Sequence, residues 1–336
     1  MRTSSRLSIL LPILLLSGCE AIKDKLQGLL GLADLSLVGV TPADGFADPG
    51  SVDHGVFFVA LGAEDEEGNL VAPLVDLLEV RDESGEPLVV EDSEEREGSN
   101  RGSMFVLVDE SSSLTGTDPE EHRKTAVALL AKQLGKCATG WRMTLQGFYG
   151  SSGNLNEVVP WTDDLSQIEA GADMLDANGA TDLYDAVGMS IGMVADDVSS
   201  SFNGNDVGAA LVVISDGADT ASFDWGPTSM LDEAGSAGIP VHTVGLGPAS
   251  DQAPDASDDL VALLRDLSDV SGGVYGAASE ASDLPRVAEA IAKAHCGGYS
   301  VLVVRHDDPP ESGSLVDGEV GVADTNVSAP FTFVAP

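Results

Sequence analysis

The stretch GSMFVLVDESSS, residues 102–113, decides the fold of this chain. Its apolar run Met104–Val108 is typical of a β-strand that is buried on both faces of a sheet. Sheets of that kind occur in α/β proteins, whose helices cover the two faces. Asp109, Ser111 and Ser113 stand directly after the run. The stretch therefore predicts an α/β domain with polar side chains at the carboxyl end of its first strand, where such folds place their functional groups.

Strands alternate with helices from this stretch to about residue 296. The segment Asp118-Pro119-Glu120-Glu121 predicts the first helix start, because it combines an N-cap, Pro at the first helical position and Glu at the third. Further strands are predicted over 142–149, 209–215, 239–245 and 273–277, and further helices over 182–194, 228–237, 258–267 and 284–295. This alternation predicts a doubly wound, mostly parallel sheet, a Rossmann-like α/β domain over residues 101–296.

Strand-like sequence flanks this domain on both sides. Short apolar or alternating runs precede it at 35–40, 55–61, 77–81 and 88–91, and follow it at 299–305, 314–322 and 331–334. The charged stretch 91–101, EDSEEREGSNR, is typical of a linker. Three C-terminal strands are too few to bury a face alone, whereas four from the N-terminal flank complete a seven-stranded sandwich. We therefore expect residues 34–100 and 297–336 to form one β-sandwich around the inserted α/β domain, with two separate small β modules as the alternative.

The N-terminus has the layout of a secretory signal. Arg2 and Arg6 precede an apolar run, Leu7–Leu16, and small residues follow it. The run is too short for a membrane span, which needs about 20 apolar residues. We therefore expect residues 1–18 to be a signal peptide of an exported protein.

The end of this signal, Leu16-Ser17-Gly18-Cys19, resembles the bacterial lipobox. The resemblance implies that Cys19 is acylated and becomes the first mature residue, anchored in the cell envelope; an ordinary signal peptide with a chance cysteine is the alternative. Several acyl chains hold a protein at a membrane where one does not. Residues 19–33 then form a tether, and Glu20, in the place where Asp favours inner-membrane retention, favours the outer membrane or cell surface.

The chain has three cysteines, Cys19, Cys137 and Cys296. Lipidation uses Cys19 and leaves two in an oxidising compartment. A Cys137–Cys296 disulfide is therefore the first hypothesis, and two buried free thiols are the alternative.

The composition is strongly acidic. Lys and Arg number 16 against 56 Asp and Glu, so the formal net charge is −40. Such a charge excludes nucleic acids and anionic membrane surfaces as probable partners, because both are bound through Lys and Arg. The 43% of apolar residues suffices for a folded core. No motif explains the acidic excess, which we interpret as a solubilising surface.

Hydroxyl and carboxylate side chains gather at the predicted strand ends. Besides the three residues of the opening stretch, Thr181 stands in GATDLYDA (179–186) and Asp216 directly follows the strand predicted over 209–215. Neither Cys nor His is among them. Oxygen donors of this kind suit Mg²⁺, Mn²⁺ or Ca²⁺ and disfavour zinc. Capping of strand and helix ends is the structural alternative.

The DxSxS pattern after a buried strand, the Thr of GATDLYDAV and the Asp of VVISDG, in that order, resemble the von Willebrand factor type A domain over residues 101–296. The resemblance implies a metal-ion-dependent adhesion site formed by Asp109, Ser111, Ser113, Thr181 and Asp216. In the family pattern the three hydroxyls are ligands, and the two Asp act directly or through water. One divalent cation, Mg²⁺ first and Mn²⁺ or Ca²⁺ otherwise, is the implied cofactor.

The charge of such a site indicates what it binds. Two carboxylates balance one divalent cation, and hydroxyls donate little charge, so the cation stays electrophilic with an open position. An Asp or Glu of a protein partner can fill that position. We therefore expect an envelope lipoprotein that binds a protein ligand; a substrate-recognition or assembly subunit of a larger envelope enzyme or export complex is the alternative.

Signatures of an enzyme are absent from the sequence. Gly188-Met189-Ser190-Ile191-Gly192 matches the G-x-S-x-G hydrolase elbow, but Ser190 falls in the middle of a predicted helix instead of a strand-to-helix turn. The histidines show no metal-binding spacing, and there is no glycine-rich phosphate loop. We expect no catalytic residue.

The doubly wound topology places the first and last helices on one face, with their carboxyl ends at the pole opposite the metal. Cys137 follows the first helix and Cys296 ends the last. Integrin-type relatives change affinity by sliding the last helix. A Cys137–Cys296 bridge would resist that movement and predicts a nearly fixed affinity.

Overall fold

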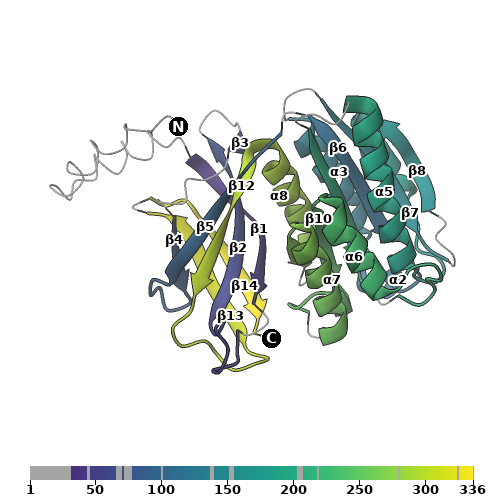
Figure 1. Ribbon diagram of the computed structural model, residues 1–336. Helices are drawn as coiled ribbons and strands as arrows, with labels where there is room; N and C mark the ends of the chain where they lie inside the picture. Colours follow the sequence, from purple (N-terminus) through teal and green to yellow (C-terminus); the bar gives the residue numbers. More distant parts are fainter. Residues whose placement is uncertain are drawn as a thin grey trace.

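The computed structural model describes residues 32–43, 46–65, 70–71, 78–99, 101–136, 140–150, 155–202, 207–217, 219–253, 255–278, 280–323 and 325–335. The predicted signal peptide, Cys19, the tether up to residue 31 and Cys137 lie outside these ranges. Within them, an α/β body and a β-sandwich lie side by side (Figure 1). No helix in the described ranges has the length and apolar character of a membrane span.

A six-stranded sheet forms the centre of the α/β body. Its strand order is β11 (Tyr275–Ala278), β10 (Val241–Leu246), β9 (Gly208–Ser215), β6 (Gly102–Asp109), β7 (Trp141–Phe148) and β8 (Leu155–Thr162). All neighbouring pairs are parallel except β7 and β8. The predicted mostly parallel, doubly wound sheet is confirmed. The antiparallel edge strand β8 was not predicted.

Helices cover both faces of this sheet (Figure 1). One face carries α3 (His122–Leu134), α4 (Ser166–Gly171) and α8 (Leu284–Gly297). The other carries α5 (Leu183–Phe202), α6 (Pro227–Ala237) and α7 (Asp258–Ser271). All eight residues of β6 are buried, with Met104 facing α3 and α8 and Phe105 facing the other helices. Each such side chain contributes about 1.5–3 kcal/mol on burial, so the apolar run holds both layers to the sheet.

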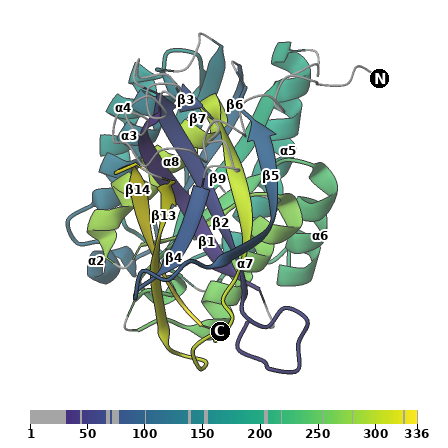
Figure 2. The ribbon, with the colours of Figure 1, turned by 90° about the vertical axis from the view of Figure 1, so that its left-hand side faces the viewer.

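The two flanks form a single β-sandwich (Figure 2). One sheet has the order β1 (Leu32–Pro42), β2 (Val56–Asp65), β12 (Gly298–Arg305) and β5 (Val89–Glu97), with β3 (Leu70–Val71) beside β2. The other has the order β14 (Ser328–Val334), β13 (Leu315–Val322) and β4 (Leu78–Asp82). Because β12 lies between β2 and β5, the strands that precede and follow the α/β body share one sheet. The expectation of one sandwich is confirmed, and the two-module alternative is wrong.

Aromatic side chains from both flanks fill the sandwich core. Phe57 of β2 and Phe333 of β14 lie with their ring centroids 5.1 Å apart, and Phe46 packs edge-on against Phe333 at 5.3 Å. Ring pairs in this range add about 0.5–1.5 kcal/mol beyond their burial. The N- and C-terminal flanks are therefore joined by side-chain packing as well as by strand pairing.

Two local expectations are corrected by the structure. The stretch 91–101 is not a linker throughout, because β5 extends to Glu97 and pairs with β12. The first long helix begins at His122 and not after Asp118. Asp118 still caps it, since its carboxylate accepts hydrogen bonds from the N–H groups of His122 and Arg123 at 2.7 and 3.1 Å.

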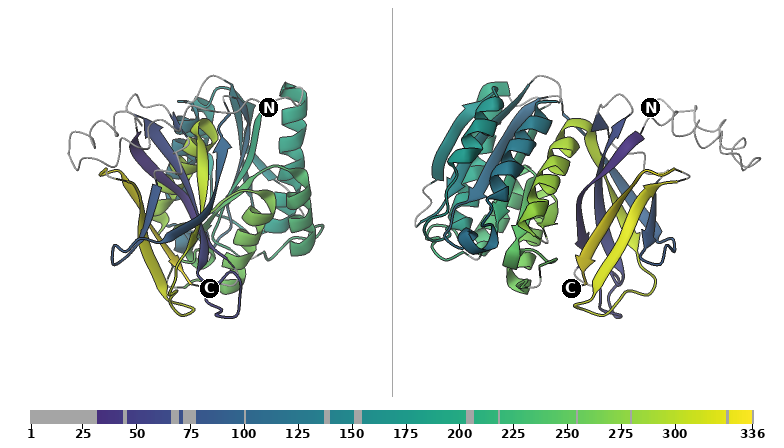
Figure 3. Two further views of the ribbon diagram at one scale, coloured as in Figure 1. Left: turned by 60° about the vertical axis from the view of Figure 1, so that its left-hand side comes forward. Right: turned by 180° about the vertical axis from the view of Figure 1, so that it is seen from behind.

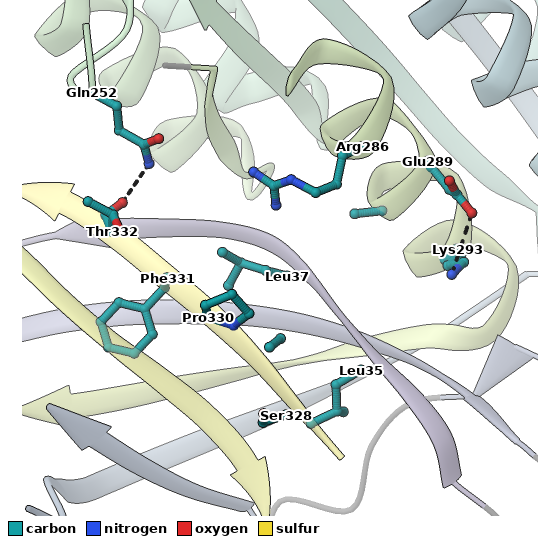
Figure 4. Close-up of a pocket in the computed structure, with 12 residues that line it drawn as sticks. Leu35, Leu37, Gln252, Arg286, Glu289, Lys293, Ser328, Pro330, Phe331 and Thr332 are labelled. Atoms are coloured by element: carbon teal, nitrogen blue, oxygen red, sulfur yellow. Dashed lines mark hydrogen bonds and ion pairs between the residues drawn. The ribbon is translucent and has the colours of Figure 1, made fainter. Parts of the chain in front are cut away.

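Helix α8 lies between the central sheet and the sandwich (Figure 3). It is apolar on several sides, and β2 approaches it closely at Gly62, where a Cβ would lie 3.7 Å from the Ala294 nitrogen. Beside it a cavity of about 500 Å³ separates α8 from β1 and β14 (Figure 4). Gln252 crosses this boundary by donating a 2.6 Å hydrogen bond to the Thr332 carbonyl. The sandwich is thus fastened to the α/β body on both sides of the cavity.

Candidate metal site

The candidate site lies where the chain order of the central sheet reverses. The chain runs from β6 outward to β8 and then returns to β9 on the other side of β6. Asp109 is the last residue of β6, and Asp216 directly follows β9. Doubly wound sheets bind their ligands at this reversal, beyond the carboxyl ends of the strands. Parallel pairing of β6 with β9 therefore brings the two carboxylates to one edge.

Asp109 is almost completely buried and firmly held. One carboxylate oxygen accepts a 2.8 Å hydrogen bond from the Ser111 N–H, and the other accepts a 2.7 Å bond from the Ser215 hydroxyl. Burial raises the pKa of Asp109 to about 6 against the hydrogen bonds that lower it, and the charge of Asp216 raises it further. The charge of Asp216 thus disfavours the ionisation of Asp109 in the absence of a cation.

A run of hydroxyls connects the rest of the cluster. The Ser111 and Ser113 hydroxyl oxygens lie 2.8 Å apart. Ser113 donates a 3.0 Å hydrogen bond to one Asp216 oxygen, and Thr117 of the short helix α2 (Leu114–Thr117) donates to the other. Four of the five predicted residues are therefore joined by direct contacts or by the Ser111 backbone.

Asp216 has a raised pKa, with burial as the main cause. The hydrogen bonds from Thr117 and Ser113 and the positive charge of Arg123 act in the opposite direction. Arg123 is itself buried and pairs with Asp118 at 2.8 Å. The Asp216 carboxylate is thus surrounded by hydrogen-bond donors, whereas the nearby positive charge of Arg123 is paired with Asp118.

Thr181 reaches the same edge from another loop. Its N–H donates to the Thr220 hydroxyl at 3.0 Å, and its carbonyl accepts from the Thr220 N–H at 2.8 Å. A Cβ placed on Gly217 would lie 3.8 Å from the Thr181 hydroxyl oxygen and 3.9 Å from an Asp109 carboxylate oxygen. The Thr181 hydroxyl and the Asp109 carboxylate therefore both lie within 4 Å of one point beside Gly217, so the structure brings all five predicted residues to one place.

Neighbouring residues fix the loops that carry these side chains. Glu110, fully buried, accepts a 2.7 Å hydrogen bond from the Asp176 N–H and a 2.9 Å bond from the Asn156 amide. The exposed Ser112 donates from both its N–H and its hydroxyl to the Gly179 carbonyl, at 3.1 and 3.0 Å. These bonds tie the DxSxS loop to the loop that leads into Thr181.

Asp185, in the first turn of α5, holds a third loop. Its carboxylate accepts the N–H groups of Phe223, Asp224 and Trp225 at 2.9, 3.1 and 2.7 Å. A carboxylate that accepts several backbone N–H groups is a strong anchor. The segment that follows Asp216 is consequently held against the helix that follows Thr181.

The donor set fits a hard divalent cation. It consists of two carboxylates and three hydroxyls, the oxygen chemistry that Mg²⁺, Mn²⁺ and Ca²⁺ prefer. Two buried carboxylates with raised pKa values would both be stabilised by a positive charge between them. In the described residues no three His, Cys, Asp or Glu side chains form a metal-binding group.

Two contributors were not predicted from the sequence. Ser215 and Thr117 each donate to one of the carboxylates. Ser215 directly precedes Asp216, and Thr117 stands four positions after Ser113, so polarity beside the motif was the available signal. The sequence position of neither residue reveals its contact with a carboxylate. These contacts form only because the pairing of β6 with β9 brings the two loops together.

The other residues singled out from the sequence lie away from this edge. Ser190 is buried in α5 and donates to the Ala186 carbonyl at 2.7 Å, as expected of a helix interior and not of a nucleophile. His242 at the start of β10 and His295 near the end of α8 place their Nε2 atoms 2.6 Å apart. Burial lowers the pKa of His295 to about 4. The pair is part of the interior at the pole opposite the candidate site.

Residues 104–218 match the von Willebrand factor type A domain family. No curated protein matches the chain. The matched segment contains Asp109, Ser111, Ser113, Thr181 and Asp216. The α/β body thus has the fold of a von Willebrand factor type A domain, as the resemblance implied.

Several solved structures are similar to the chain at low identity. A von Willebrand factor type A protein from Catenulispora acidiphila is 11% identical, with 83% of this chain and 68% of that chain covered and a TM-score of 0.47. The pilus adhesin SpaC from Lactobacillus rhamnosus GG is 13% identical, with 84% and 47% covered and a TM-score of 0.46. Proximal thread matrix protein 1 from the mussel byssus, with a zinc-occupied MIDAS motif, is 14% identical, with 65% and 50% covered and a TM-score of 0.44. The chain spans about half the length of the latter two.

Proposed function

We propose that this protein binds a protein ligand through a divalent cation held by Asp109, Ser111, Ser113, Thr181 and Asp216. The observation that carries the proposal is the convergence of these five side chains at the β6–β9 reversal, with Asp109 and Asp216 buried and linked through hydroxyls. Mg²⁺ is the proposed cation, and Mn²⁺ or Ca²⁺ would suit the same donors.

The cation would supply an electrophilic position that accepts a carboxylate of the partner. The residues of this chain determine how strongly the cation attracts that carboxylate. Two carboxylates bring the site to neutrality with a divalent ion, and the hydroxyls of Ser111, Ser113 and Thr181 add no further negative charge. Thr117 and Ser215 hydrogen-bond to the carboxylates and hold their orientation. An Asp or Glu of the partner therefore meets an electrophilic cation within an otherwise acidic protein.

We further propose that the protein is exported and anchored to the cell envelope by acylation of Cys19, at the outer membrane or cell surface. Support comes from the signal-like residues 1–18 and the lipobox-like LSGC. Labelling of bacteria with a radioactive or clickable fatty acid tests this proposal. Wild-type protein should carry the label and Cys19→Ser should not, and an unlabelled wild type would refute the anchor.

The metal-dependent function is tested by calorimetry and partner capture. The wild-type protein should bind Mg²⁺, and Asp109→Ala should lose that binding, since the site then keeps one carboxylate. Asp196→Ala, at an exposed position of α5, is the matched control and should behave as wild type. Capture of a partner that survives both EDTA and Asp109→Ala would rule the proposal out.

A recognition or assembly subunit of a larger envelope enzyme or export complex is the second candidate. The same site would then present a substrate to another protein instead of attaching the cell to a ligand. Affinity purification in Mg²⁺ separates the two. Stoichiometric recovery of an envelope enzyme, lost with Asp109→Ala, favours the subunit; recovery of an extracellular ligand alone favours adhesion.

A further inference from the structure

Two exposed aromatic side chains stand on the loops that form the candidate metal site. Phe223 is 85% exposed and Tyr149 is 41% exposed. Single exposed apolar residues are common on protein surfaces, so exposure alone indicates little. Their position does indicate a role, because the loop of Phe223 is hydrogen-bonded to Thr181 of the site and the loop of Tyr149 is hydrogen-bonded to Ala180, directly before Thr181.

Tyr149 lies beside the loop that carries Thr181. A Cβ placed on Gly179 would lie 3.2 Å from the Tyr149 ring, and the neighbouring Gly150 N–H donates to the Ala180 carbonyl at 2.8 Å. The Gly179 carbonyl in turn accepts both bonds from Ser112, which stands between the two serines of the site. The ring therefore borders the site at the DxSxS loop.

Phe223 belongs to the loop that follows Asp216. This loop is bound to Thr181 through Thr220 and to Asp185 through the Phe223 N–H at 2.9 Å. The Tyr184 N–H also donates to Asp219 at 3.0 Å. Because these hydrogen bonds hold the loop at several points, the exposure of Phe223 does not result from mobility of the loop. Phe223 is presented to solvent by a fixed backbone.

Charge limits what kind of segment can approach. The chain carries a formal net charge of −40, so each additional acidic residue of a partner is repelled, whereas one acidic residue is accepted by the cation. The two exposed aromatic side chains beside the site can supply further affinity through apolar contact, because aromatic residues are enriched in the cores of protein interfaces.

We infer that Phe223 and Tyr149 form, together with the metal, the partner-binding surface, and that the partner segment has a single Asp or Glu close to apolar or aromatic residues. This inference rests on the proposed function, because the acidic residue is assigned to the cation. It adds a specificity that the five metal-site residues do not have. Phe223 and Tyr149 bind the side chains that flank the acidic residue.

Selection from a random 12-residue peptide display library in Mg²⁺ tests the inference. We expect the wild-type protein to enrich peptides with one acidic residue and a nearby Phe, Trp, Tyr or Leu. Phe223→Ser should lose the apolar preference and keep the acidic one. Val52→Ser is the matched control, because Val52 is 84% exposed but lies in the sandwich, and it should select the wild-type pattern.

A synthetic peptide from the wild-type selection then gives the magnitude. Phe223→Ser should weaken its binding about fivefold or more, the usual threshold for an important interface residue, and Phe223→Leu should restore most of the loss. Mg²⁺ affinity measured without peptide should be the same in all variants.

The experiment distinguishes failure of this inference from failure of the proposed function. Enrichment of acidic peptides without an apolar neighbour, or equal peptide affinity of Phe223→Ser and wild type, overturns this inference and leaves the proposed function standing. Selection that shows no acidic preference and no Mg²⁺ dependence overturns the proposed function and this inference with it.

Discussion

Ser113 and Asp216 are 103 positions apart in the chain, and a 3.0 Å hydrogen bond from the Ser113 hydroxyl joins them. The contact exists because β6 and β9 are parallel neighbours, so that the loops after them meet at one edge of the sheet. Both Asp216 and the equally buried Asp109 have raised pKa values. The metal-free site is therefore electrostatically unfavourable at neutral pH.

Asp109 should make the metal-free protein less stable as the pH rises. Its pKa in the folded state is about 6 against an ordinary 3.8, so the folded state holds this proton more tightly than the unfolded state. Stability is then full below about pH 4 and falls by about 3 kcal/mol up to about pH 6. Urea unfolding in EDTA should show this loss in wild type and not in Asp109→Asn. Parallel pH profiles of the two proteins would contradict the assignment.

Mg²⁺ should stabilise the protein more at pH 7.5 than at pH 5, because protons compete with the cation for the two carboxylates. Saturation at a hundred times the dissociation constant adds about 2.7 kcal/mol. Thermal unfolding with and without Mg²⁺ at the two pH values measures this difference. Asp109→Asn should show little Mg²⁺ stabilisation at either pH, and a rise equal to that of wild type would be inconsistent with the site.

Thr117→Val should weaken Mg²⁺ binding, whereas Thr117→Ser should keep it. The Thr117 hydroxyl donates to Asp216 and lowers its pKa, so the loss of this donor favours the protonated carboxyl. A hydrogen bond to a charged group contributes about 1.5–3 kcal/mol, which corresponds to about tenfold or more in affinity. Calorimetric titration of both variants tests this. Wild-type affinity in Thr117→Val would show that the contact has no role in the site.

The His242–His295 pair should make the α/β domain sensitive to acid. Burial depresses the pKa of His295 to about 4 from 6.5, so the unfolded state takes up this proton first as the pH falls. The stability is present above pH 6.5 and is lost, by about 3 kcal/mol, as the pH falls to about 4.

Comparison of His295→Gln with wild type isolates this effect, because the opposing contribution of Asp109 is common to both. The variant should be less stable at pH 7.5, and its deficit should shrink as the pH approaches 4. His306→Gln, after β12, is the control for the loss of a histidine outside this pair. A constant deficit for His295→Gln over this range would remove the pair as a source of acid sensitivity.

Cys296→Ser should change the affinity of the site if the predicted bridge to Cys137 restrains α8. Helices α3 and α8 pack side by side, and Gln133 of α3 donates to Glu289 of α8. Cys137 lies outside the described residues, so the bridge itself stays a prediction and is first tested by non-reducing peptide mass spectrometry.

Loss of a native disulfide costs about 2–5 kcal/mol of stability. Release of α8 should also shift Mg²⁺ affinity by about fivefold or more, the usual scale of coupling between sites. An intact bridge whose removal changes stability but neither metal nor peptide affinity would mean that it does not control the site.

The α/β domain was predictable because its signals are local. The run Met104–Val108 indicates a strand buried on both faces wherever it stands, and the polar residues after it are placed by chain connectivity alone. The order of the three motifs then identifies the edge at which they meet. All five candidate residues are found at that edge.

The predictions from the sequence were wrong or incomplete where a segment forms a strand through its pairing with a distant strand. β5 contains mainly charged residues and resembled a linker, yet it is an edge strand that pairs with β12 through its backbone. Edge strands often carry charged side chains, which discourage the unpaired edge from pairing with another chain. β8 was also not predicted. It is an edge strand that contains Pro160, and it forms through its pairing with β7.

The sequence by itself determined which residues can bind a hard cation, since the kinds of donor and their positions at strand ends are fixed by the chain. Only the tertiary structure decided that Ser215 and Thr117 complete the surroundings of the carboxylates, that the loop bearing Phe223 is held by Asp185, and that β12 joins the two flanks into one sandwich. The physical reason is that these contacts depend on pairing between strands far apart in the chain, and the energy of such pairing comes from backbone hydrogen bonds and burial that no single segment contains.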